Sequence, residues 1–180
     1  MSRHGLFALF STVALLIAQP SVYAALFCAT QETLSQGEKY ADQILRSGAV
    51  RKVEGRAGYY MDRLQNDLQF SPAVTRRPSD DTILLCFDTG YLFSKKSIRT
   101  HQKGRSALAD LARLLRTFKG TAVVVQVFTD SPSEEKLAQR RAKSVKNRLQ
   151  TDGIAKARIA AAGALANSKH IEILLKVRIR

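Results

Sequence analysis

An aspartate and an arginine are the two residues whose placement suggests chemistry. Asp130 ends a β-branched stretch at residues 121–130, and Arg141 lies on the apolar face of the helix predicted after it. That face also carries Leu137, Val145 and Leu149. A carboxylate and a guanidinium at a fixed separation suit a zwitterionic ligand. They equally suit a structural pair that ties the strand to the helix, because an unpaired buried charge is costly. Both hypotheses stay open.

The elements that position this pair have strong local signals. Residues 121–130 predict a buried strand, since the stretch is β-branched and follows a glycine. The next residues predict the start of a helix, with Pro132 in the first turn and Ser131 and Glu134 as a capping box. The helix is expected to end at Gly153, because glycine permits a left-handed cap.

The remaining pattern predicts an α/β (α+β) fold over residues 81–180. Further strands are expected at residues 82–88, 157–163 and 170–179, and a helix from near His101 to Phe118. This βαβαββ order suits a two-layer sandwich, in which two helices cover one face of a mixed sheet.

The last predicted strand alternates between apolar and charged residues. Its odd positions from Ile171 to Ile179 are expected to face the core, while Glu172, Lys176 and Arg178 point outward. His170, at the start of this strand, is expected at the surface.

Composition limits the function classes. The chain has 180 residues and a formal net charge of +14, so an anionic partner is expected. The positive charge concentrates on the two helices predicted within residues 81–180. The sequence shows no catalytic triad, carboxylate pair, glycine-rich phosphate loop or metal-ligand spacing. We therefore expect a protein that is not an enzyme and has neither a cofactor nor a metal.

The N-terminus predicts export. Arg3 precedes an apolar run at residues 6–18, and Val22-x-Ala24 supplies a cleavage site, so residues 1–24 are expected to be a signal peptide. A retained N-terminal anchor and a lipidated Cys28 are the alternatives. Export makes nucleic acid an improbable partner. In an oxidising compartment Cys28 and Cys86 can form a disulfide, although a buried free thiol at Cys86 is equally natural.

Residues 25–80 predict a separate helical region. Helices are expected at residues 30–48 and 59–70, and the proline-containing stretch 71–81 is expected to be a linker. These helices either complete the core of the following domain or dock onto a partner protein.

Several motifs resemble one family. Residues 125–130 and 137–149 resemble the OmpA-like peptidoglycan-binding domain, with agreement at Thr129, Asp130, Leu137, Arg141, Ala142, Val145 and Leu149. Residues 87–92 and 170–175 are similar to two further strand motifs of the family. The resemblance implies that Asp130 and Arg141 hold the diaminopimelate of a peptidoglycan stem peptide, next to Thr129. Asn167 and Lys169 remain as polar contributors from the loop before the last strand.

The sequence also departs from the family pattern. Val127-Phe128 replaces Gly-His, and the loop before the last strand is shortened to residues 164–169. The first hypothesis is therefore a noncovalent peptidoglycan anchor in the periplasm of a Gram-negative bacterium, associated with the outer membrane or the cell wall. The alternative is a degenerate docking or scaffold subunit of an outer-membrane-associated, type IV-like secretion complex. In that alternative the N-terminal helices hold the neighbouring protein.

Overall fold

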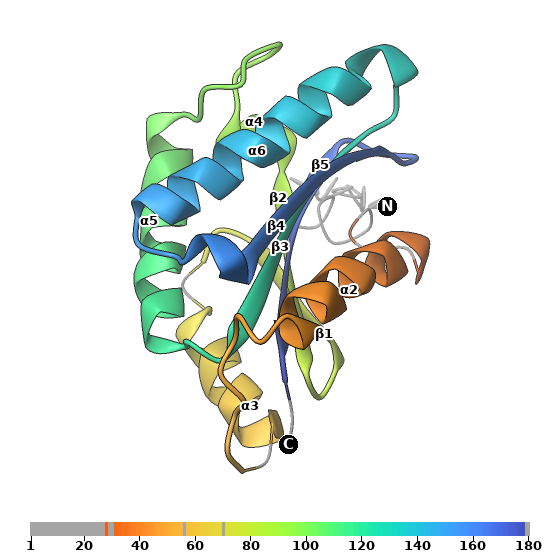
Figure 1. Cartoon of the computed structure of the whole chain (residues 1–180). Coiled ribbons are helices and arrows are strands. Elements are labelled where there is room, and N and C mark those ends of the chain that lie inside the picture. Colours follow the sequence, from red (N-terminus) through yellow and green to blue (C-terminus); the bar gives the residue numbers. More distant parts are fainter. Residues whose placement is uncertain (1–27, 29–30, 56, 70, 179–180) are drawn as a thin grey trace, which may run out of the picture.

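A mixed five-stranded sheet forms the centre of the molecule (Figure 1). The computed structural model describes residues 28, 31–55, 57–69 and 71–178, so the expected signal peptide lies outside the described residues. The sheet order is β1-β2-β5-β3-β4, and only β3 and β4 run parallel. The strands are β1 (Val74–Ser79), β2 (Thr82–Asp88), β3 (Thr121–Thr129), β4 (Ile159–Leu165) and β5 (His170–Val177).

Helices cover both faces of this sheet. They are α2 (Gln31–Arg46), α3 (Ala57–Asp67), α4 (Thr89–Leu92), α5 (Gln102–Thr117) and α6 (Glu135–Thr151). Figure 1 shows α5 and α6 on one face and α2 on the other. From β2 onward the order is βαβαββ, so the predicted two-layer fold is confirmed. Helix α2 adds a third layer to it. Within the described residues, no helix combines the length and the apolar character needed to cross a bilayer.

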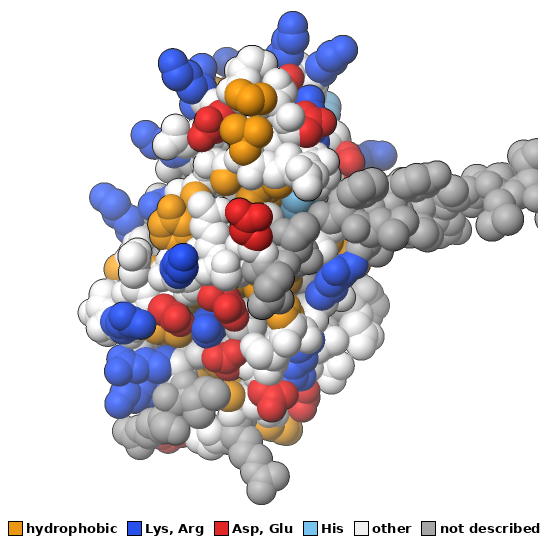
Figure 2. Space-filling model, turned by 90° about the vertical axis from the view of Figure 1, so that its right-hand side faces the viewer, with side chains coloured by type: hydrophobic (Ala, Val, Ile, Leu, Met, Phe, Trp, Pro, Cys, Tyr) orange, Lys and Arg blue, Asp and Glu red, His pale blue; other side chains and the backbone are white. Residues whose placement is uncertain are grey.

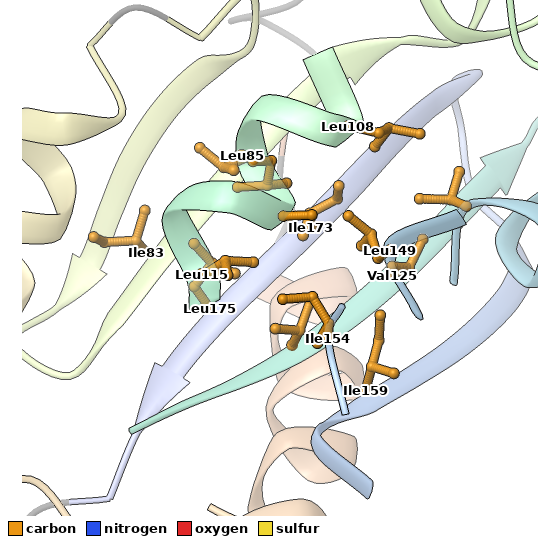
Figure 3. Close-up of a cluster of buried hydrophobic side chains, with 14 of the residues drawn as sticks. Ile83, Leu85, Leu108, Leu115, Val125, Leu149, Ile154, Ile159, Ile173 and Leu175 are labelled. Atoms are coloured by element: carbon orange, nitrogen blue, oxygen red, sulfur yellow. The ribbon is translucent and has the colours of Figure 1, made fainter. Parts of the chain in front are cut away.

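The face under α5 and α6 is mostly apolar. Alternate strand residues point to it, because successive side chains of a strand face opposite sides. Figure 3 shows part of this core, with Leu108 and Leu115 of α5 and Leu149 of α6 packed on the sheet. Helix α6 lies very close to β4 at Gly163, where an added Cβ would stand 2.2 Å from the backbone nitrogen of Gln139. This approach requires a glycine.

The face under α2 is mixed, which corrects the expectation for the last strand. Glu172 was expected to point outward, but it is fully buried because α2 covers the even-numbered positions of β5. Leu174, the one apolar even position, packs into the same cluster. Lys176 pairs with Asp42 of α2, with Nζ 3.1 Å from the carboxylate. The charged residues of β5 therefore face a polar interface with α2 and not solvent.

Two contacts hold α2 close to the sheet. Cys28 and Cys86 form a disulfide with their Cα atoms 5.9 Å apart, which joins the chain ahead of α2 to β2. Within α2, an added Cβ at Gly37 would lie 2.3 Å from the side-chain oxygen of Gln126 on β3. The glycine that weakens α2 as an isolated helix is therefore the residue that lets the helix approach the sheet.

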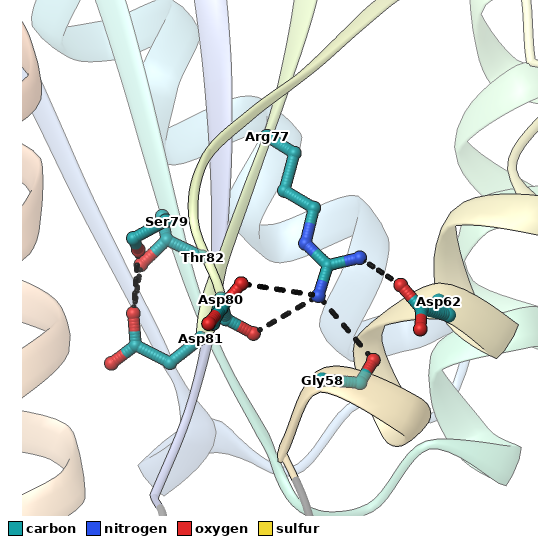
Figure 4. A network of polar contacts seen from close by, with 7 residues as sticks. All are labelled: Gly58, Asp62, Arg77, Ser79, Asp80, Asp81 and Thr82. Atoms are coloured by element: carbon teal, nitrogen blue, oxygen red, sulfur yellow. Dashed lines mark hydrogen bonds and ion pairs between the residues drawn. The ribbon is translucent and has the colours of Figure 1, made fainter.

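The stretch expected to be a linker contains strand β1, so the prediction of a loop there was wrong. β1 pairs antiparallel with β2 at the edge of the sheet, where Pro78 is tolerated because an edge strand has unpaired positions. Figure 4 shows how Arg77 of β1 ties this edge to α3. Its guanidinium pairs with Asp62 and donates to the carbonyl of Gly58 at 3.3 Å.

Candidate functional site

The predicted site residues gather at the carboxyl end of β3. Thr129 is the last residue of β3 and Asp130 follows it, ahead of a 3-10 turn at Pro132–Glu134 and then α6. The predicted capping box does not form, since the Ser131 hydroxyl bonds to the Ser133 hydroxyl at 2.8 Å and makes no capping bond to a backbone N–H. Glu134 is instead free to turn toward the loop before β5, which carries Lys169.

Lys169 joins two carboxylates at this end of the sheet. Its Nζ lies 2.8 Å from Glu134 Oε2 and 3.3 Å from Asp130 Oδ1. The hydrogen bond to Glu134, followed by the one to Asp130, raises the pKa of Lys169, and the same contact lowers the pKa of Glu134. The hydroxyl of Thr129 also donates to Glu134 Oε2, at 3.4 Å. Three predicted residues and Glu134 thus form one network.

Arg141 stands apart from Asp130. Of the ion pairs among the described residues, none joins the two, so the structural pair considered from the sequence is not formed. The buried guanidinium donates from Nε to the carbonyl of Ser97 at 2.8 Å and from Nη2 to that of Ser94 at 3.0 Å. It also lies over the ring of Phe93, 5.2 Å from the centroid. Burial lowers the pKa of Arg141, and the charge of Glu134 partly opposes this. Arg141 therefore holds the loop that follows α4.

Two hollows flank the end of β3, and they divide the predicted residues. On the α6 side, Thr129, Arg141 and Lys169 line a cavity of about 10 Å³. That is about the smallest volume that holds one water molecule. On the α2 side, Asp130 and Asn167 line a hollow of about 670 Å³. The division follows from strand alternation, which sends neighbouring side chains to opposite faces. Only the second hollow has room for a ligand.

Phe128 occupies the position where the family pattern has histidine, and its packing explains this departure. Its ring stacks on His170 with the centroids 4.8 Å apart. His170 is buried, contrary to the expectation of a surface residue, and its Nε2 lies 2.9 Å from Glu172 Oε1. A bulky residue at position 128 therefore packs against a buried histidine beneath the α2 side of the sheet.

Sequence reasoning missed several members of the site. Glu134 was assigned to helix capping, although a carboxylate five residues after Thr129 was visible as a second acid beside Asp130. The carbonyls of Ser94 and Ser97 carry no side-chain signal. Glu32 and Gln36 of α2, which line the larger hollow, come from a distant part of the chain. Only the packing of α2 brings them here.

Figure 2 shows the molecule from the side of α2. Basic side chains project around its upper end, with acidic side chains between them. The site thus lies at an end of the molecule where charges of both signs are exposed.

Comparisons with known proteins agree with this fold. Residues 92–172 match the OmpA family. The chain is 32% identical over 116 residues to the probable lipoprotein YiaD of Escherichia coli, a match that covers 61% of this chain and 53% of YiaD. The chain thus spans about half the length of that curated relative.

Solved structures show the same architecture. A MotB-like protein from Desulfovibrio vulgaris superposes with a TM-score of 0.59 at 15% identity, covering 69% of this chain and 93% of that one. The cell wall anchor of the T6SS from Pseudomonas aeruginosa superposes with a TM-score of 0.53 at 23% identity, covering 68% of this chain and 98% of that one. Residues 92–172 thus match the OmpA family model, and the solved structures share the fold of this chain.

Proposed function

We propose that this OmpA family domain binds peptidoglycan noncovalently, through the diaminopimelate-bearing stem peptide, and anchors an envelope component to the cell wall. The observation that carries the proposal is the position of Asp130. Its side chain is 49% exposed at the carboxyl end of β3 and lines a hollow of about 670 Å³. A carboxylate that is accessible beside a ligand-sized hollow suits the ammonium group of diaminopimelate.

Arg141 supports the same proposal from the other side of β3. Its two hydrogen bonds to the carbonyls of Ser94 and Ser97 use two of the five guanidinium N–H groups. Arg141 lines a cavity of about 10 Å³, so we propose that the remaining donors bind a ligand carboxylate only once this cavity widens. Arg141 also holds the neighbouring loop in place, so its removal has both a direct and an indirect effect on the site.

The relatives favour this function over catalysis. One structural relative is described as a cell wall anchor, and YiaD as a probable lipoprotein, so both names point to the cell envelope. With the predicted signal peptide, they support a periplasmic location for this chain. A binding function accords with a site built from two carboxylates, a lysine and an arginine that pair or bond to backbone carbonyls.

Co-sedimentation with purified sacculi tests the proposal. We expect the mature protein to bind at moderate salt and Asp130→Asn to bind at least tenfold more weakly, because a charge-assisted contact is worth about 1.5–3 kcal/mol. The control is Asp110→Asn, which removes an exposed acid of α5 that pairs with Arg113, far from the hollow in sequence and in the fold. Binding that both variants keep at low salt, and that salt removes from all three proteins, would show attraction by net charge alone, because each change makes the protein more positive.

A docking function is the second candidate. The shortened loop before β5 and the cavity of about 10 Å³ beside Arg141 favour it, because they leave little open space on the family-like side of the site. It predicts that the parent protein fails to bind sacculi at any salt concentration. In that outcome the envelope partner becomes the main ligand of the domain.

A further inference from the structure

The hollow beside Asp130 has a wall that lies outside the family match. Glu32, Thr33 and Gln36 of α2 form this wall, whereas the OmpA family match begins at residue 92. The opposite wall contains Asp130 and Asn167, the two predicted site residues on this side of β3. The hollow is therefore built jointly by the family domain and by the N-terminal region.

The lining of the hollow selects a type of ligand. Two carboxylates, Glu32 and Asp130, line it, and no lysine or arginine is among its described lining residues. The side-chain amides of Gln36 and Asn167 supply donors and acceptors suited to a peptide backbone. Leu165, which is 46% exposed, adds an apolar surface. These groups suit an extended peptide that carries a cationic group.

The wall formed by α2 is held in place before any ligand binds. The side-chain amide of Gln126 donates to the carbonyl of Thr33 at 3.5 Å, and the Thr33 hydroxyl donates to Glu172 Oε1 at 3.4 Å. The disulfide of Cys28 lies just ahead of this turn. A preformed wall lowers the entropic cost of binding, because the first turn of α2 is already ordered against the sheet.

We propose that the first turn of α2 is part of the ligand site. In this proposal the ammonium of the stem peptide lies between the carboxylates of Glu32 and Asp130, and Gln36 contacts the peptide backbone. The proposal rests on the function proposed above and extends it, because it assigns ligand contacts to residues outside the OmpA family domain.

The experiment is calorimetric titration with the soluble tripeptide N-acetyl-L-Ala-γ-D-Glu-meso-diaminopimelate, whose one free amine is that of diaminopimelate. We expect the double variant Glu32→Gln/Gln36→Ala to bind at least tenfold more weakly than the parent. Glu38→Gln is the matched control, because Glu38 lies on the same helix but faces Lys176, 3.8 Å away, instead of the hollow. Its affinity should stay within twofold of the parent. Circular dichroism and disulfide content establish that each variant keeps α2 folded.

A second arm separates direct contact from an effect on folding. Acetylation of the free amine of the tripeptide removes its positive charge, so the parent should lose affinity for it. The single variant Glu32→Gln should lose much less affinity when the amine is acetylated, because the interaction between the ligand ammonium and the Glu32 carboxylate is already absent in this variant. An equal loss in parent and variant would overturn the proposed contact.

The outcomes distinguish the two proposals. If the parent binds the tripeptide and the double variant binds equally well, α2 is not part of the site and the wall-anchor function stands. If the parent does not bind, the proposed function fails and the assignment of α2 fails with it.

Discussion

The two faces of the sheet are built from different chemistry. Beneath α5 and α6 the buried residues are mostly apolar, and the buried Arg141 and Arg158 there donate to backbone carbonyls. Beneath α2 the sheet buries Gln126, Glu172 and His170. The outer surfaces differ as well. Apart from the buried Arg141, helix α6 carries five basic and one acidic side chain. Helix α5 carries four basic and one acidic side chain, while α2 carries two basic and three acidic ones.

This difference indicates that the α5/α6 layer and the α2 layer have separate roles. Apolar burial is the main source of stability, so the α5/α6 face is expected to determine whether the domain folds. Buried polar groups contribute little net stability but require specific partners, so the α2 face is expected to determine where α2 sits. The predictions below test that separation, beginning with the largest expected effect.

The first prediction concerns the apolar face. Leu149→Ala should lower the free energy of unfolding by about 4 kcal/mol, because it removes a fully buried side chain and leaves a cavity. Urea denaturation followed by circular dichroism measures this. Leu165→Ala, at a position that is 46% exposed, is the control and should change stability by less than about 0.5 kcal/mol. A cost below about 1 kcal/mol for Leu149→Ala would contradict the assigned role of this face.

The second prediction concerns the attachment of α2. Replacing Cys28 and Cys86 by alanine should lower the free energy of unfolding by about 3 kcal/mol, because the disulfide no longer restricts the unfolded chain. Hydrogen exchange should then quicken more for the amides of α2 than for those of α5 and α6. Uniform quickening through all three helices would show that the two faces are one cooperative unit.

The third prediction is the smallest and concerns pH. The hydrogen bond from Lys169 holds the pKa of Glu134 below its ordinary value. The contact therefore stabilises the folded protein at pH values above the pKa that Glu134 has in the unfolded chain. This stabilisation is lost as the pH falls through the pKa of Glu134 in the folded protein. The contact with Glu134 raises the pKa of Lys169. Lys169 therefore contributes its whole stabilisation of the folded protein at pH values below its pKa in the unfolded chain. This stabilisation is lost as the pH rises through the pKa of Lys169 in the folded protein. In Lys169→Gln, an NMR titration should show the pKa of Glu134 returning toward its ordinary value. An unchanged Glu134 titration would mean that the contact is absent in solution.

Lys169 also bears on ligand binding. It already contacts Asp130, so the ammonium of a stem peptide must share that carboxylate or displace the lysine. The Lys169→Gln variant therefore serves a second purpose in the sacculus assay, where binding that persists at moderate salt separates specific recognition from attraction by charge.

The sequence predicted the part of the fold in which local pattern and tertiary packing agree. The β-branched stretch at β3, the apolar stripe of α6 and the cap at Gly153, where φ is 102°, all appear as expected. The predicted site residues also lie near one strand end. The division of those residues between two hollows was not predictable, because it depends on which helix covers each face of the sheet.

By itself, the sequence determined the order of strands and helices from β2 onward and the basic character of α5 and α6, because both follow from residue type and period along the chain. Only the tertiary structure decided that Glu172 and His170 are buried, that Glu134 pairs with Lys169, and that α2 closes one side of a hollow at Asp130. Those contacts join segments far apart in sequence, and no local pattern specifies which of them meet.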